Sequence, residues 1–157
     1  MLGATTKFRM TIDQIIKTLN EFVPFFEDDI FNDNETFLSE LMDSWTEARD
    51  KEKAVAAIFQ LMEKYPHADF GSPGPLVHSL EACGANMYER ELHKSLMRKP
   101  TSLTLLMYNR IINEENDSRI VKGHTERLKL FSKHPLVDAD TKETVENFIK
   151  HQEERLS

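Results

Sequence analysis

Three side chains that could bind a metal ion, His67, Asp69 and His78, fall close together in one stretch of the chain. Their spacing matches no metal-binding pattern, and the sequence contains neither His-Glu-x-x-His nor a pair of cysteines. We therefore expect neither a metal nor another cofactor. We expect Asp69 to cap a turn, or to accept hydrogen bonds from backbone amides beside Gly71.

Two further features could in principle support catalysis. Cys83 is a possible nucleophile, but its position predicts an apolar helix face, where unactivated thiols are common. The triplet Asp69-Phe70-Gly71 matches the magnesium-binding triplet of protein kinases, yet the other kinase motifs are absent. The sequence therefore predicts that the protein is not an enzyme.

Acidic residues are concentrated in one segment. Residues 21–50 hold ten acids and one base, a net charge of −9, whereas the rest of the chain holds nineteen bases and seventeen acids and carries +2. A concentrated field can steer a basic partner, and it disfavours nucleic acid, whose phosphates need basic neutralisation. The alternative is a solvated acidic helix face without a partner. We predict partner contacts for six residues of this segment: Glu27, Asp28, Asp29, Asp33, Glu40 and Asp43.

Composition indicates one globular domain without disulfides. A chain of 157 residues with 39% hydrophobic content is long enough to bury a core, and its single cysteine cannot form an internal disulfide. No apolar run reaches the length of a membrane span, and the N-terminus lacks a signal-peptide pattern. Residues 89–133 hold ten bases and six acids without a dense basic stripe, which gives direct nucleic-acid binding little support. We expect a cytoplasmic protein that binds neither membranes nor nucleic acid.

Apolar residues at helical spacing predict an all-α fold. Thr11, Asp50, Ser72 and Asp140 are expected to cap helices, as is the Asn-Asp-Asn run ending at Asn34. Seven or eight short helices are expected, over residues 12–23, 34–47, 51–65, 73–83, 86–98, 103–113, 118–134 and from about 141 to 156.

Short loops that carry proline near the helix starts favour helix hairpins stacked side by side. We predict an irregular, HEAT-like α-solenoid, with a compact irregular helical bundle as the alternative. Residues 1–10 are predicted to form a flexible tail, and residues 11–157 a single helical domain. The oligomeric state stays open.

Six residues are predicted to have architectural roles. Asp69, Gly71, Pro73 and Pro75 belong to the most constrained stretch of backbone, with Pro73 expected at the first position of a helix. Asn109 and Arg110 form a polar pair inside the most apolar helix. They could line a binding groove, but we favour a structural role in which the arginine binds free carbonyls at an adjacent helix end.

Residues 65–131 resemble a group of small helical, HEAT-like bacterial immunity proteins that are encoded beside polymorphic toxins. The likeness rests on Asp69-Phe-Gly-Ser-Pro-Gly-Pro-Leu-Val-His78, on Pro100-Thr-x-x-Thr104, and on Leu106 with Asn109-Arg110. The resemblance implies a protein of a contact-dependent growth inhibition or related system, which binds a cognate toxin domain and blocks it.

Such toxin domains are commonly basic nucleases, which an acidic inhibitor could cover by charge complementarity. The resemblance and the acidic segment therefore favour an immunity protein whose partner is a basic nuclease, more narrowly an RNase. A helical adaptor or scaffold for another protein is the alternative. The matched positions lie outside the acidic segment, so the resemblance assigns no toxin contacts.

Overall fold

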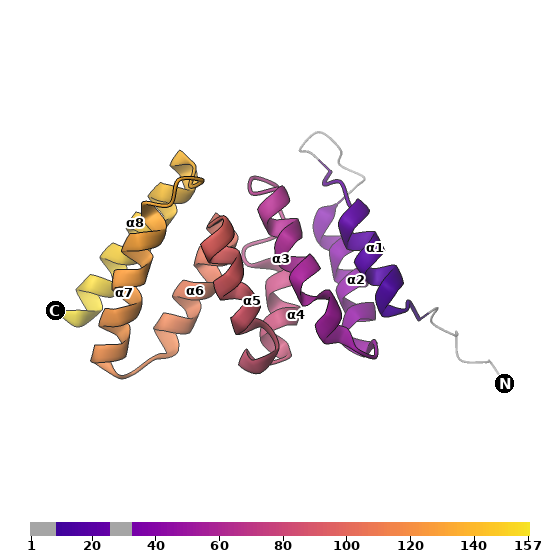
Figure 1. Cartoon of the computed structure of the whole chain (residues 1–157), viewed down its shortest axis with the longest axis horizontal. Coiled ribbons are helices and arrows are strands. Elements are labelled where there is room, and N and C mark those ends of the chain that lie inside the picture. Colours follow the sequence, from indigo (N-terminus) through magenta and orange to yellow (C-terminus); the bar gives the residue numbers. More distant parts are fainter. Residues whose placement is uncertain (1–8, 26–32) are drawn as a thin grey trace.

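The computed structural model of the protein describes residues 9–25 and 33–157, and all of their regular structure is helical (Figure 1). This confirms the all-α prediction. The helices are α1 (Ile12–Glu21), α2 (Asn34–Glu47), the 3₁₀ helix η1 (Lys51–Ala54), α3 (Val55–Lys64), α4 (Gly74–Ala82), α5 (Ala85–Arg98), α6 (Ser102–Glu114), α7 (Ser118–Ser132) and α8 (Ala139–Leu156).

The helices follow one another along the long axis of the molecule, from α1 at one end to α7 and α8 at the other (Figure 1). Odd-numbered neighbours pack against each other in one layer, α1 on α3 and α3 on α5, and even-numbered neighbours in another, α2 on α4 and α6 on α8. The arrangement fits a helical bundle, and the HEAT-like solenoid stays a prediction.

One hydrophobic cluster runs through the described helices from α1 to α8. Trp45, Tyr108 and Phe59 are its largest fully buried side chains. Trp45 also donates a hydrogen bond from Nε1 to the carbonyl oxygen of Lys51, at 2.7 Å, so the end of α2 is tied to the start of η1. Helix α6, the most apolar helix by sequence, contacts α3, α5, α7 and α8, as expected of a helix that is covered on more than one side.

Several helix starts are set by local capping. Thr11 caps α1, as predicted, and forms a reciprocal capping box with Gln14; Thr101 and Thr104 form another at α6. Asp117 caps α7 through a hydrogen bond from the backbone N–H of Arg119, at 2.9 Å. Side-chain oxygens at these positions satisfy backbone donors that have no partner within the helix.

Three predicted helix caps are wrong. Ser72 does not cap α4, and Pro73 is the residue before the helix, joined to Ser72 by a cis peptide bond; Pro75 is the second helical residue. Asp50 adopts a left-handed conformation (φ 55°) without a capping hydrogen bond, and a 3₁₀ helix follows it. Asp138, not Asp140, caps α8, because its carboxylate accepts from the backbone N–H of Thr141 at 2.7 Å.

The predicted tail lies mostly outside the described residues, which begin at Arg9. Within the part that is described, Met10 packs against the hydrophobic cluster. Gly123 lies inside a continuous α7, although glycine in a helix interior favours a break.

Candidate partner-binding surface

The loop between α3 and α4 is held by a small set of polar contacts. Asp69 accepts a hydrogen bond at Oδ1 from the backbone N–H of Gly71, at 3.0 Å, in an Asx-type turn. Asn34, at the start of α2, donates from Nδ2 to the carbonyl oxygens of Asp69 (3.1 Å) and Phe25 (3.0 Å). The loop and the beginning of α2 are therefore fixed to each other.

Gly71 allows this close approach. Its φ is +96°, a conformation that L side chains rarely adopt, and a Cβ there would lie 2.4 Å from the Cα of Gly74 and 2.8 Å from Oε1 of Glu35. Only glycine fits this position without a shift of the surrounding backbone. The stretch that the sequence singles out thus sets how α4 meets α2.

Asn109 and Arg110 both make contacts between helices. Arg110 forms a bidentate ion pair with Glu81 of α4, at 2.9 and 3.0 Å. Asn109 is buried and accepts at Oδ1 a hydrogen bond from Nε2 of Gln152 in α8, at 2.8 Å. Arg110 therefore binds a carboxylate instead of the helix-end carbonyls that we expected.

Arg155 of α8 makes the contact that was expected of Arg110. Its guanidinium donates to the carbonyl oxygens of Ile112 (3.2 Å) and Glu115 (3.1 Å) at the end of α6, and also to Oε1 of Gln152. A cation at a helix C-terminus satisfies free carbonyls and interacts favourably with the helix dipole.

The predicted contact residues fall into three groups. Glu27, Asp28 and Asp29 lie outside the described residues. Asp33 is exposed but has a capping role, because its carboxylate accepts from the backbone N–H of Glu35 (2.8 Å) and from the hydroxyl of Thr36 (3.0 Å). Glu40 and Asp43 lie exposed on α2.

Glu47 extends the line begun by Glu40 and Asp43. The three side chains are exposed and share one face of α2, since they are spaced three and four residues apart. We call them the acidic edge. None of them forms an ion pair with any other residue in the described parts of the chain.

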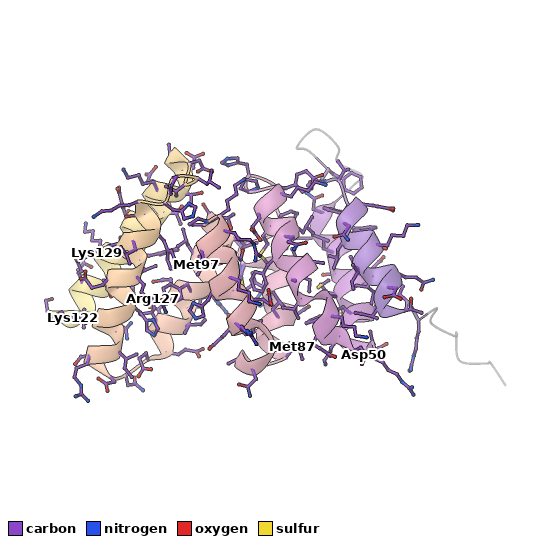
Figure 2. The ribbon with its side chains drawn as sticks, viewed as in Figure 1. Asp50, Met87, Met97, Lys122, Arg127 and Lys129 are labelled. Carbon is purple, nitrogen blue, oxygen red and sulfur yellow. The ribbon has the colours of Figure 1, made fainter. Side chains whose placement is uncertain are left out.

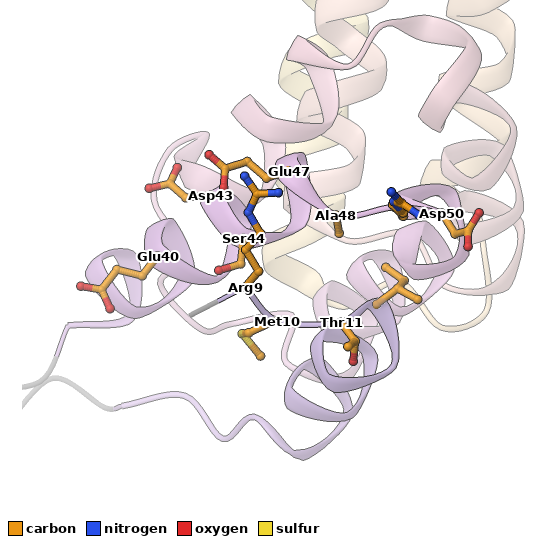
Figure 3. A pocket seen from close by; sticks show the side chains of 11 residues that line it. Arg9, Met10, Thr11, Glu40, Asp43, Ser44, Glu47, Ala48 and Asp50 are labelled. Atoms are coloured by element: carbon orange, nitrogen blue, oxygen red, sulfur yellow. The ribbon is translucent and has the colours of Figure 1, made fainter. Parts of the chain in front are cut away.

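The acidic edge borders a groove of about 630 Å³ between the start of α1 and the second half of α2, which we call the acidic groove. Figure 3 shows Glu40, Asp43 and Glu47 along one side, and Met10 and Thr11 along the other. The lining further includes Ile12, Ala48, Asp50, Arg9 and Arg49, so four acids face two bases beside an apolar floor. Such a surface suits a basic side chain with an aliphatic stem.

A second hollow, of about 370 Å³, lies on the other side of the acidic edge. Asp43 lines both hollows, and Glu35, Pro75 and His78 line the second one. The constrained loop between α3 and α4 thus lies next to the acidic edge. The sequence by itself does not indicate that these two features are neighbours.

The candidates for metal binding and catalysis are dispersed. Among residues 9–25 and 33–157, no group of three or more His, Cys, Asp or Glu side chains is placed to hold a metal ion. His67 pairs instead with Asp138 across 3.2 Å. Cys83 is a free, partly buried thiol. In the described part of the chain, no helix has the length and apolarity needed to cross a membrane.

Comparisons with protein-family models, with curated proteins and with solved structures give no match to this chain.

Proposed function

We propose that the protein is a cytoplasmic immunity protein that neutralises a cognate bacterial toxin domain by binding it through the acidic edge and acidic groove of α2. The partner is a basic nuclease domain, with RNase as the narrower choice, and the protein acts by binding and not by catalysis. The observation that carries the proposal is the line of three exposed carboxylates, without partners among the described residues, beside a groove with an apolar floor.

Charge complementarity gives the binding mechanism. Complementary fields increase association rates by roughly 10- to 1,000-fold, and they lose this effect as salt shortens the Debye length. An apolar floor beneath the carboxylates adds contact area for the aliphatic stems of lysine or arginine. A nuclease surface that binds phosphate groups offers such side chains.

The acidic edge also opposes the electrostatics of its own helix. Glu47 is the last residue of α2, and no basic residue lies in that last turn. Carboxylates are disfavoured at a helix C-terminus, and like charges spaced three or four residues apart repel each other. Carboxylates that destabilise the helix that carries them are consistent with a role in binding.

The test measures binding of the toxin domain, which under this proposal is the C-terminal domain of a large secreted protein encoded immediately upstream of this gene. The triple variant Glu40→Lys, Asp43→Lys and Glu47→Lys should lower the association rate constant at least about 10-fold at low salt and flatten its salt dependence. Asp33 is left intact because its loss would disturb the start of α2.

The matched control reverses three exposed carboxylates of α8: Glu143→Lys, Glu146→Lys and Glu154→Lys. It changes the net charge by the same amount at a distant surface, so it should bind nearly as fast as the unaltered protein. Equal slowing in both triple variants would show that net charge alone matters and would exclude the acidic edge as the interface. Growth rescue on co-expression with the toxin domain checks neutralisation, and absence of such an upstream gene would favour an adaptor instead.

A further inference from the structure

Three aromatic rings from three helices meet where α7 joins the rest of the molecule. Tyr108 of α6 is fully buried, with His93 of α5 on one side (ring centroids 5.7 Å apart) and His124 of α7 on the other (5.3 Å). Both histidine rings meet the phenol edge to face, and Phe131 packs on it in the same manner at 5.8 Å.

The hydrogen-bonding atoms of this cluster suit neutral histidine rings better than protonated ones. The Tyr108 hydroxyl is hydrogen-bonded to Nδ1 of His124, and the charge of Arg127 acts on the same phenol. While His124 is neutral, either Nδ1 or the hydroxyl can be the donor in this bond, whereas a protonated Nδ1 can only donate. Nδ1 of His93 is buried and has no hydrogen-bond partner.

The charges around both histidines oppose protonation. Burial lowers the pKa of His93 and of His124, and the Arg127 cation lowers both further. Glu89 of α5 acts in the opposite sense on both rings, and Glu115, after α6, on His124, but these acids do not restore the usual pKa of either ring. No charged group of α8 is among those that shift either ring.

The cluster lies at the joint of the terminal helix pair. Helix α7 packs mainly on α8, and the pair meets the rest of the described molecule chiefly where α8 and α7 contact α6. Figure 2 labels Arg127 on α7 and Met97 on α5, on either side of this joint. The rings of His93, Tyr108 and His124 therefore bridge α5, α6 and α7, in addition to the hydrogen bond between Nε2 of His134, just after α7, and the carbonyl oxygen of Met97 in α5.

From this geometry we propose that the α5–α6–α7 joint is an acid-sensitive contact, which helps to hold the α7–α8 pair in place while His93 and His124 are neutral and weakens when they are protonated. Protonation would place two cations beside Arg127, give Nδ1 of His93 a buried proton without an acceptor, and leave Nδ1 of His124 unable to accept from the Tyr108 hydroxyl. This proposal is independent of the proposed function, because the acidic edge lies at the opposite end of the molecule.

The direction of the pH dependence follows from proton linkage. Both histidines bind protons less readily in the folded joint than in an open one, so the contact is fully present above the ordinary histidine pKa of about 6.5 and weakens as pH falls below it. Each histidine increases the opening equilibrium constant by up to about tenfold per pH unit in that range, and the two together by up to about 100-fold.

The experiment measures amide hydrogen exchange of the whole chain at pH 7 and pH 5, corrected for intrinsic rates, with histidine ring titrations by NMR. Amides of α7 and α8 should lose protection about 10-fold or more at pH 5, while those of α1–α3 keep theirs. The double variant His93→Gln and His124→Gln should remove this pH dependence, since glutamine can still accept from Tyr108 but does not become charged.

The control His151→Gln removes an exposed histidine of α8 and should leave the pH dependence of α7 and α8 as it is in the unaltered protein. If His93 and His124 titrate no lower than His151, or if acid opens α1–α3 as much as α7–α8, the proposal is wrong. The ring titrations on the unaltered protein decide the matter even if the double variant fails to fold.

Discussion

Replacing Glu47 by glutamine should make the protein more stable, although no contact is added. Glu47 is exposed and is the last residue of α2, whose last turn contains no basic residue. Asp43 lies four residues earlier on the same face, so their carboxylates repel each other. Glutamine has nearly the same shape and helix propensity as glutamate, and the substitution therefore isolates the charge.

The expected gain combines two terms. Removing an unfavourable charge from a helix C-terminus is worth about 0.3–1 kcal/mol, and removing one like-charge pair about 0.2–0.5 kcal/mol. The total of roughly 0.5–1.5 kcal/mol would raise the urea midpoint by roughly 0.25–0.75 M, for an m-value of about 2 kcal/mol/M.

The assay is equilibrium urea unfolding at low salt and again near 1 M salt, where the Debye length falls to about 3 Å. The gain should shrink at high salt because both terms are electrostatic. Asp140→Asn is the matched control of opposite sign, because Asp140 lies in the first turn of α8, where a carboxylate is favourable, and its loss should destabilise by about 0.3–1 kcal/mol.

Two results would refute this reasoning. A gain for Glu47→Gln that is as large at 1 M salt as at low salt could not come from screened charges. A loss of stability would show that the carboxylate has a favourable partner within the protein. Under the proposed function, the same variant should bind the toxin domain more slowly, so stability and association rate should change in opposite directions.

Gly71→Ala should destabilise the protein by roughly 2–5 kcal/mol, because it combines a positive φ with a Cβ 2.4 Å from the Cα of Gly74. Gly84→Ala has open space around the added Cβ and should cost only about 1–3 kcal/mol. Equal urea midpoints for the two variants would show that the backbone around Gly71 relaxes freely. Gln152→Leu should cost about 1–3 kcal/mol because buried Asn109 loses its amide donor and because Asn113 and Arg155 also lose a hydrogen-bond partner. Adding Asn109→Leu should recover the part of that loss that belongs to Asn109. A double variant as unstable as the sum of both single variants would contradict this.

Local signals in the sequence predicted most of the helices. The capping box at Thr11 and the cap at Asp33 require only residues three or fewer positions away, and both were recoverable from residue type and spacing. The caps of α4 and α8 were predicted at the wrong residues. Several polar residues or prolines lie within three positions of each other at these helix starts, and each of them suits the N-cap pattern.

Contacts between distant residues could not be predicted in this way. Arg110 and Arg155 both lie on helices beside possible partners. Only the packing of α6 on α8 places Arg155 at the carbonyls that end α6, and only the tertiary structure shows that Arg110 pairs with Glu81 of α4. Glu47 could have been added to the predicted contact residues, because it follows Asp43 at helical spacing within the same acidic segment.

The constrained loop and the acidic surface, separate in the sequence, are one structural unit. Asn34 binds the carbonyl of Asp69 while it starts α2, and Gly71 lets the loop approach Glu35 at the first turn of the same helix. The orientation of α2, and with it the line from Glu40 to Glu47, therefore depends on backbone positions that only glycine and a turn-forming aspartate satisfy. Under the proposed function, residues that look purely architectural are positioning residues for binding, because an inhibitor that relies on charge needs its carboxylates held in a fixed line.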